Sequence, residues 1–333
     1  MQESEVIRSI HRAFPDRREM TPIGIGDDCA YLSNPGHLVT TDASVEGVHF
    51  DLSLMTFADA AYRCLSSNLS DVAAMGGYAK AWTLALGLSG DMSEATVCAG
   101  ILAMRQCLLD HGLSDAWLVG GDVVRSPHIF LSVTMWGECE DNGQRWQPVT
   151  RGGASPGDAI VLLGRAGYAA AGLEILRRKG NEAFEGVAFE RVMAHFLRPV
   201  SLTKLGPVLA REGVVSAMMD TSDGLYADLP RLLEQSHVGA MVDLETLSGG
   251  INDDLDVVAE ALGRSPRYFR LYGGEDFGLL ATVPVKMVDC VEKLAYFYAV
   301  PMRVVGKIEA NQGIRWQQGG KLVSLEDHSF SHF

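Results

Sequence analysis

The sequence has no excess of positive charge: 28 Lys and Arg residues face 42 Asp and Glu residues, giving a formal net charge of −14. A chain this acidic repels polyanions at long range, so nucleic acids and anionic membranes are not expected partners. No apolar run approaches the ~20 residues needed to span a bilayer. Residues 1–5 are acidic where a signal peptide would be basic. These features predict a cytoplasmic protein with no membrane partner.

Cysteine patterns that would indicate zinc or disulfides are also missing. The six cysteines include no C-x-x-C pair and have no His partners at zinc-binding spacing. Scattered cysteines in a chain of 333 residues argue against a disulfide framework. We therefore expect most of them to be small apolar side chains in a reducing compartment.

The common nucleotide-binding signatures do not occur either. The chain has no G-x-x-x-x-G-K-[ST] loop and no G-x-G-x-x-G that opens a helix after a strand. The protein-kinase pairing of H-R-D with D-F-G is absent as a set. These absences argue against a P-loop, a Rossmann or a protein-kinase site.

What the sequence does have is an alternation of helical and strand patterns, long enough for two cores. A segment rich in Gly, Pro and small polar residues, 147–158, indicates a boundary, which gives an N-terminal domain at 1–148 and a C-terminal domain at 149–333. The expected fold is α+β in both domains. The patterns predict helices at 6–14, 58–75, 93–110, 169–179, 187–197 and 225–234. They predict strands at 38–41, 81–88, 117–119, 129–136, 159–163, 214–219, 277–283 and 304–308.

Six short segments place Gly, Ser or Thr beside Asp or Glu near predicted element ends. They are 24–28 (GIGDD), 40–42 (TTD), 68–71 (NLSD), 120–122 (GGD), 220–224 (DTSDG) and 273–276 (GGED). Each segment alone is explained by turn chemistry, because Gly supplies positive φ and Asp bonds the neighbouring backbone. Their joint occurrence is more informative, since residues at the ends of buried strands lie where ligands bind.

Convergence of these carboxylates would require positive charge to offset their repulsion. The acidic loops contain no Lys or Arg, so we expect divalent cations to supply that charge. Mg²⁺ prefers oxygen ligands and bridges to phosphates, which makes such a cleft a place for ATP. Transfer of the γ-phosphoryl to another phosphate needs metals and alignment but no general base, because the acceptor is already ionised.

Two further residues are open to two interpretations. Arg151, followed by Gly152 and Gly153, is either a phosphate contact or a solvated arginine in a turn at the domain boundary. His49, beside Phe50, either lines an acceptor pocket or is a core histidine whose hydrogen bonds are satisfied.

Taken in order, the segments resemble the motifs of the thiamine-monophosphate kinase family. The matching stretches are GIGDDCA, TTD followed by VEGVHF, NLSDVAAMGG, GGD, TRGGASPGD, TSDGL and GGEDF, between about residues 24 and 280. The resemblance implies a fold shared with aminoimidazole-ribonucleotide synthetase, selenophosphate synthetase and a hydrogenase-maturation protein. It also implies a homodimer in which the N-terminal sheet forms a barrel with its copy, while the C-terminal half packs against it.

The resemblance further implies site residues and a reaction. The implied Mg²⁺ shell is Asp28, Thr40, Thr41, Asp42, Asp71, Asp122, Asp220 and Asp223. The implied ATP contacts are Gly121, Asp122, Arg151 and Ser222, and the implied acceptor contacts are His49, Glu275 and the aromatic Phe330. The implied reaction is direct in-line transfer of the ATP γ-phosphoryl to thiamine monophosphate. This is the last step of thiamine diphosphate synthesis, and it involves several Mg²⁺ ions and no phospho-enzyme.

Two positions depart from the family pattern, and two alternatives stay open. Ala43–Ser44 follow the TTD aspartate, and Val123–Val124 follow the GGD aspartate, where the family usually has hydroxyls near the metals. The first alternative is a sibling ATP-dependent synthetase, such as aminoimidazole-ribonucleotide synthetase, although the His49 segment and GGED favour the thiamine enzyme. The second is a non-catalytic nucleotide- or metal-binding homologue, against which the retention of every acidic loop argues.

Overall fold

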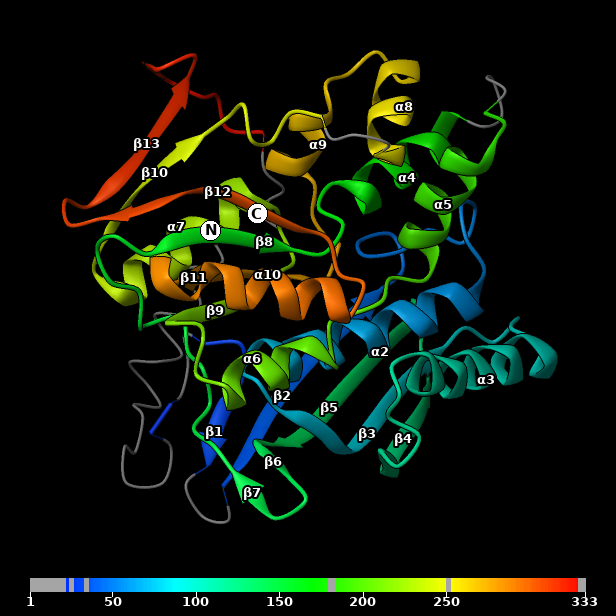
Figure 1. Ribbon diagram of the computed structural model, residues 1–333. Helices are drawn as coiled ribbons and strands as arrows, with labels where there is room; N and C mark the ends of the chain where they lie inside the picture. The colour runs from blue at the N-terminus through cyan, green and yellow to red at the C-terminus, as the bar shows by residue number, and fades with distance from the viewer. Residues whose placement is uncertain (1–21, 24–26, 33–35, 179–183, 250–252, 329–333) are drawn as a thin grey trace.

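The computed structural model describes residues 22–23, 27–32, 36–178, 184–249 and 253–328. The helix expected at 6–14 and the side chain of Phe330 lie outside these residues. Figure 1 shows two α+β halves, one below the other, each built on its own sheet. The expected α+β fold is confirmed, whereas the domain boundary between 148 and 149 stays a prediction.

The first sheet has five strands in the order β1-β2-β5-β3-β4. The strands are β1 (Ala30–Leu32), β2 (His37–Val45), β5 (Phe130–Glu138), β3 (Tyr78–Leu88) and β4 (Trp117–Arg125). Only β3 and β4 are parallel. A small hairpin follows, made of β6 (Glu140–Asp141) and β7 (Gln144–Arg145).

Two helices, α2 (Phe57–Ala74) and α3 (Glu94–Asp110), cover one face of this sheet. Helix α2 begins where Thr56 and Asp59 form a reciprocal capping box, and α3 begins at the expected cap, Ser93. In α2, 14 of 18 residues are buried, which is far more than one amphipathic face requires. The reason is that α2 lies between the first sheet and the second half of the chain.

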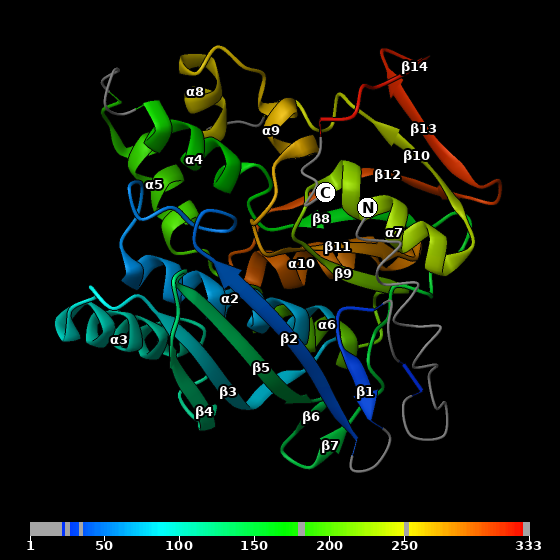
Figure 2. The same ribbon diagram turned by 180° about the vertical axis from the view of Figure 1, so that it is seen from behind.

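The other face of the first sheet carries no helix within the described residues, as Figure 2 shows. The edge strand β4 is exposed at all nine positions, although its sequence is largely apolar. Its exposed large side chains are Trp117, Leu118, Val119, Val123 and Val124. An apolar strand with an open edge is typical of an association surface.

The second sheet has seven strands in the order β14-β13-β10-β12-β8-β11-β9. They are β8 (Ala159–Leu163), β9 (Ala217–Thr221), β10 (Gly239–Asp243), β11 (Gly278–Val283), β12 (Met302–Glu309), β13 (Gly313–Gln318) and β14 (Lys321–Val323). Strands β8, β9 and β11 are buried throughout, because helices cover both faces of this part of the sheet.

Helix α7 (Leu225–Ser236) covers one of these faces, and α6 (Leu205–Arg211) and α10 (Val288–Phe297) cover the other (Figures 1 and 2). Beyond the sheet, a separate apolar cluster joins α4 (Tyr168–Arg178), α5 (Val187–Leu197), α8 (Asp254–Ala261) and α9 (Pro266–Tyr272). A single 3-10 turn, η1 (Val285–Met287), precedes α10.

The predicted helices and strands within the described residues are all present, but several strands are longer than expected. Strand β4 continues six residues past the predicted end at residue 119 and so includes the GGD segment. The pattern analysis did not predict the helices α6, α8, α9 and α10 or the strands β1, β6, β7, β10, β13 and β14. None of the described helices combines the length and the apolar character needed to cross a bilayer.

Candidate active site between the two domains

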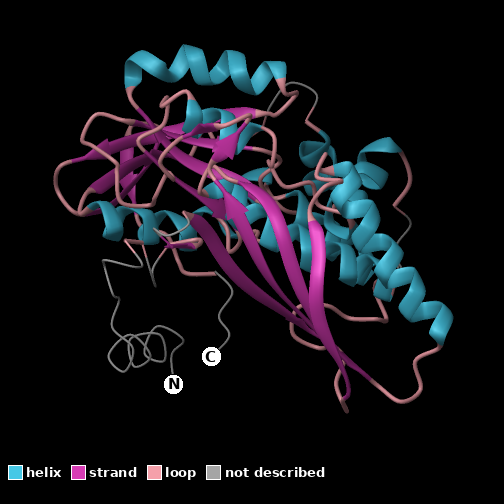
Figure 3. Cartoon of the chain, turned by 90° about the horizontal axis from the view of Figure 1, so that it is seen from below, coloured by secondary structure: helices cyan, strands magenta, loops and turns pink. Residues whose placement is uncertain are grey.

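Three carboxylates from distant parts of the chain meet where the two halves touch. Asp28 precedes β1, Asp71 lies near the end of α2, and Asp220 lies on β9. One oxygen from each can be chosen so that all three lie within 4.8 Å of one another. Helix α2 and strand β9 are in contact at this junction. Figure 3, the view from below, shows the long strands at the front of the molecule with helices behind and beside them.

Asp28 and Asp220 are buried and Asp71 is half-buried, and burial dominates the electrostatics of the cluster. Burial raises the pKa of Asp71 well above its usual range, and the charges of Asp42, Asp220 and Asp28 raise it further. Burial and the Asp28 charge likewise raise the pKa of Asp220. The Thr40 hydroxyl donates to Asp71 Oδ2 at 2.6 Å, which partly stabilises that carboxylate. Full ionisation of the cluster therefore requires nearby positive charge.

Two arginines supply some of that charge, which corrects the expectation that divalent cations alone would do so. Arg151 Nη2 lies 2.7 Å from Asp28 Oδ1, and Arg231 Nη1 lies 2.6 Å from Asp223 Oδ2. Burial acts to lower the pKa of Arg151, but Asp28 and Asp27 raise it above its usual value. Arg231 also bonds the fully buried Asp228, one turn earlier on α7. Neither arginine is within an acidic loop, so the loop sequences gave no sign of them.

Backbone hydrogen bonds hold the GGED segment against the TSD segment. Glu275 N–H donates to the Ser222 carbonyl at 2.7 Å, and Phe277 N–H donates to the Thr221 carbonyl at 3.1 Å. A Cβ on Gly274 would lie 2.4 Å from the Ser222 oxygen, so only glycine allows this approach. The contact places the Glu275 side chain beside Ser222 and Asp223.

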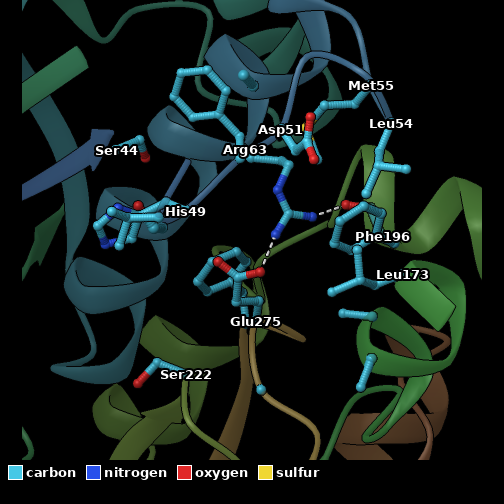
Figure 4. A pocket seen from close by; sticks show the side chains of 18 of the residues that line it. Ser44, His49, Asp51, Leu54, Met55, Arg63, Leu173, Phe196, Ser222 and Glu275 are labelled. Atoms are coloured by element: carbon cyan, nitrogen blue, oxygen red, sulfur yellow. Dashed lines mark hydrogen bonds and ion pairs between the residues drawn. The ribbon is translucent and has the colours of Figure 1, made fainter. Parts of the chain in front are cut away.

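These segments line a cavity of about 510 Å³ between the domains. Five of the predicted site residues face it: Asp42, His49, Ser222, Asp223 and Glu275. Figure 4 shows His49 and Ser44 on one side and Leu173 and Phe196 on the other, with Glu275 between them. The Val45 N–H donates to His49 Nδ1 at 3.2 Å, so the proton of the neutral ring is on Nε2. Of the two interpretations of His49, the structure supports the one that places it in the lining of the cavity.

Comparison with known proteins identifies the family of the chain. The family models "AIR synthase related protein, N-terminal domain" and "AIR synthase related protein, C-terminal domain" match residues 26–139 and 155–317. A protein of Escherichia coli O157:H7 named thiamine-monophosphate kinase is 34% identical, covering 93% of this chain and 92% of its own. The chain belongs to the thiamine-monophosphate kinase family.

Solved structures extend the comparison to the fold. A structure described as "AaThiL complexed with AMPPCP and TMP" is 28% identical and matches with a TM-score of 0.83, covering 100% of this chain and 97% of that one. Escherichia coli HypE, a hydrogenase maturation protein, matches with a TM-score of 0.67 at 17% identity, covering 99% and 98%. The second likeness shows the fold alone and confirms the fold shared with the hydrogenase-maturation protein.

Two positions taken from the thiamine-monophosphate kinase motifs are not brought to the cluster within one chain. The Thr41 side chain points to the opposite face of β2 from Thr40 and Asp42, and its hydroxyl donates to the Val133 carbonyl at 2.9 Å. Asp122, next to Gly121 on β4, pairs in register through β3 and β5 with Ala43 of β2. Three strand spacings separate it from β2, roughly 14 Å.

The motifs shared with the thiamine-monophosphate kinase family did not predict several residues that line the cavity. Arg63 of α2 lies at the centre of the cavity, and Arg177 of α4 also lines it. The large apolar residues that were missed include Leu54, Met55, Leu173 and Phe196. One signal was available: Arg63 is the only basic residue of α2, and it stands among apolar and small neighbours at buried positions.

Proposed function

We propose that this chain catalyses the ATP-dependent phosphorylation of thiamine monophosphate to thiamine diphosphate. The observation that supports this most strongly is the continuity between the acidic cluster and the cavity. Asp42 lines the cavity, and its charge raises the pKa of Asp71 in the cluster. A phosphate held in the cavity next to Asp42 would thus adjoin the place where metal-bound ATP phosphates fit.

We assign several Mg²⁺ ions to the cluster, because its donors are oxygens with unbalanced negative charge. Asp28, Asp42, Asp71, Asp220 and Asp223 would hold them, with Thr40 oriented by Asp71. When bound, the ions would neutralise the phosphates and hold them in line. No side chain is needed as a base, because the acceptor phosphate is already a nucleophile.

The remaining polar residues have roles in binding. Arg151 is placed to exchange its contact with Asp28 for one with an ATP phosphate, and Ser222 faces the cavity beside Asp223. His49 and Glu275 line the acceptor side, where the Glu275 carboxylate suits the cationic thiazolium ring of thiamine. Phe330, the predicted aromatic contact, stays a prediction.

We also propose a homodimer in which the first sheet closes with its copy. Strand β4 has an open apolar edge, and β1 pairs only with residues 37–39 of β2, so the rest of β2 has one open side among the described residues. Pairing β4 of each copy with β2 of the other would remove both edges. It would also bring Gly121 and Asp122 of a second copy to Asp42 and Thr41, which resolves their separation within one chain.

We place the enzyme in the cytoplasm. All six cysteines are free, and Cys98 and Cys290 are exposed. Exposed thiols stay reduced in that compartment, whereas an oxidising one would favour disulfides.

The test is ADP release from Mg-ATP with thiamine monophosphate, with the product identified by chromatography. Thiamine, aminoimidazole-ribonucleotide precursors and a reaction without acceptor serve as controls. We expect thiamine diphosphate only when both Mg²⁺ and the monophosphate are present. ADP release with another acceptor alone would identify a sibling synthetase, and no ADP under any condition would indicate a non-catalytic homologue.

A further inference from the structure

The side chain at the centre of the acceptor cavity is an arginine that no motif predicts. Arg63 projects from α2 toward Glu275, as Figure 4 shows, and its side chain is only 5% exposed. Its guanidinium donates to the Glu275 carboxylate and to the Phe196 carbonyl, and lies 4.2 Å from the centre of the Phe196 ring. Arg63 thus joins the N-terminal domain to two segments of the C-terminal domain.

The partner carboxylate stands on a backbone turn that is held from several directions. Glu275 and Phe277 have positive φ angles, 62° and 49°, which are unfavourable for residues with a side chain. Between them, Asp276 accepts from the backbone N–H groups of Gly167 and Ala169 at 2.6 and 2.8 Å. Strain of this kind persists only where surrounding contacts fix the conformation, and it clusters at functional sites.

The ion pair leaves part of the carboxylate available to a ligand. The Glu275 side chain is 39% exposed, whereas Arg63 is almost fully covered. Arg63 bonds Oε2 of Glu275, which fixes the direction of the carboxylate toward the cavity. A lysine could not reproduce this arrangement, because it lacks the planar fork that bonds carboxylate and carbonyl while stacking on a ring.

We propose that Arg63 is a positioning residue for acceptor specificity. It orients Glu275 so that the exposed part of the carboxylate meets the positively charged ring of the acceptor. This inference rests on the proposed function, which gives Glu275 its contact with the acceptor. The role is distinct from phosphoryl transfer, because Arg63 stands two helical turns before Asp71 on α2.

A second arginine provides a matched control. Arg198 follows α5 and bonds Asp59 of α2, with Nε and Oδ1 3.2 Å apart. Its guanidinium lies over the Tyr62 ring at 5.5 Å. It therefore makes the same kind of contact between the same parts of the chain, outside the cavity lining.

The experiment measures calorimetric binding of thiamine monophosphate and, separately, of Mg-AMPPCP to the full chain. The variants are Arg63→Met, Arg63→Lys, Glu275→Gln, Arg198→Met and the double variant Arg63→Met/Glu275→Gln, with circular dichroism to check folding. We expect Arg63→Met to weaken acceptor binding roughly 10- to 100-fold, the loss of one charge-assisted contact, with nucleotide affinity unchanged. The acceptor affinity of Arg63→Lys should fall between that of Arg63→Met and that of the unaltered chain. Arg198→Met should bind the acceptor as tightly as the unaltered chain. The double variant should bind no more weakly than Glu275→Gln alone.

Unaltered acceptor affinity in Arg63→Met, or additive losses in the double variant, would overturn the proposal. If Arg63→Met does not fold, Arg63→Lys decides in the same way, because it keeps the charge and loses the fork. Full acceptor affinity in Glu275→Gln would overturn it too, by removing the contact that Arg63 is said to orient. Failure of the unaltered chain to bind thiamine monophosphate would instead refute the proposed function, and the two failures are thereby separable.

Discussion

The Asp71 region and the Asp122 region contain similar residues in opposite settings. Asp71 lies at a junction of three elements, where burial and neighbouring carboxylates raise its pKa far above normal. Asp122 lies on β4, where every residue is exposed and the neighbouring side chains are apolar. A buried acidic motif is thus already placed for metal binding within one chain, whereas an exposed one on an open edge needs a second surface to complete its site.

The largest expected effect is at the buried site. Asp71→Asn should lower kcat/KM on the order of 10³-fold, because it removes a carboxylate from the centre of the proposed metal cluster. It should leave the protein as stable as before or more stable, since a neutral side chain relieves repulsion among buried carboxylates. Steady-state kinetics and urea unfolding test both points. Asp91→Asn, at an exposed loop position, is the control, and activity above a tenth of normal in Asp71→Asn would contradict the assignment.

The exposed site should behave differently when two inactive variants are mixed. Asp122→Asn alone should also be inactive, but co-expression with Asp71→Asn should restore about a quarter of normal activity. Half of randomly paired dimers are mixed, and one of the two sites in each would carry neither change. Mixing Asp71→Asn with Asp220→Asn should restore nothing, because those residues belong to one chain's cluster. Equal recovery of activity in both mixtures, or no recovery in either mixture, would rule out a site shared between two copies of the chain.

The β4 edge gives a smaller effect, on association. Val123→Lys places a charge on an apolar residue that is 67% exposed, and should shift the protein toward monomer at least tenfold in Kd. Val285→Lys, at a residue that is 69% exposed on η1 in the other domain, should leave the mass unchanged. Sedimentation across a concentration series measures both. A Val123→Lys protein that is as dimeric as the unaltered chain would exclude β4 from the interface.

Much of the buried site could be predicted from the sequence, because the signals lie in short local segments. The cap at Ser93 and the Gly after α2 set helix ends within a residue or two. Asp28, Asp71 and Asp220 were predicted together because each lies in a Gly- or Ser-bearing motif at an element end. Strand parity could also have shown that Thr41 and Asp42 point to opposite faces, since side chains alternate along β2.

Contacts between distant segments could not be predicted from the sequence. Arg231 reaches Asp223 only because α7 turns its side chain back over the loop, and Arg63 reaches Glu275 across the domain junction. A single sequence contains no signal for such pairings. The short helices α8 and α9 were missed because seven or eight residues show too little periodicity to separate them from loops.

A third group of polar residues, around the buried His111, sharpens the comparison because its hydrogen-bonding atoms have partners. His111 Nδ1 donates to the Cys107 carbonyl at 2.7 Å, and its Nε2 accepts from the Ser201 N–H at 2.9 Å. A proton on Nε2 would face that N–H, so the ring must stay neutral. Burial lowers the pKa of His111, and Lys204 lowers it further, whereas Asp110 opposes the change.

The depressed pKa of His111 has a defined consequence for stability. The unfolded chain takes up the proton near pH 6.5, so the His111 contribution is complete above that pH and is lost as pH falls below it. From pH 7.5 to 5.5 the free energy of unfolding should therefore decrease, at a rate of up to about 1.4 kcal/mol per pH unit for one proton. His111→Gln keeps a donor and an acceptor but cannot titrate, so its profile should be flatter by that slope. Urea unfolding at each pH gives the difference, and parallel profiles for the two proteins would show that His111 is not the group that loses stability in acid.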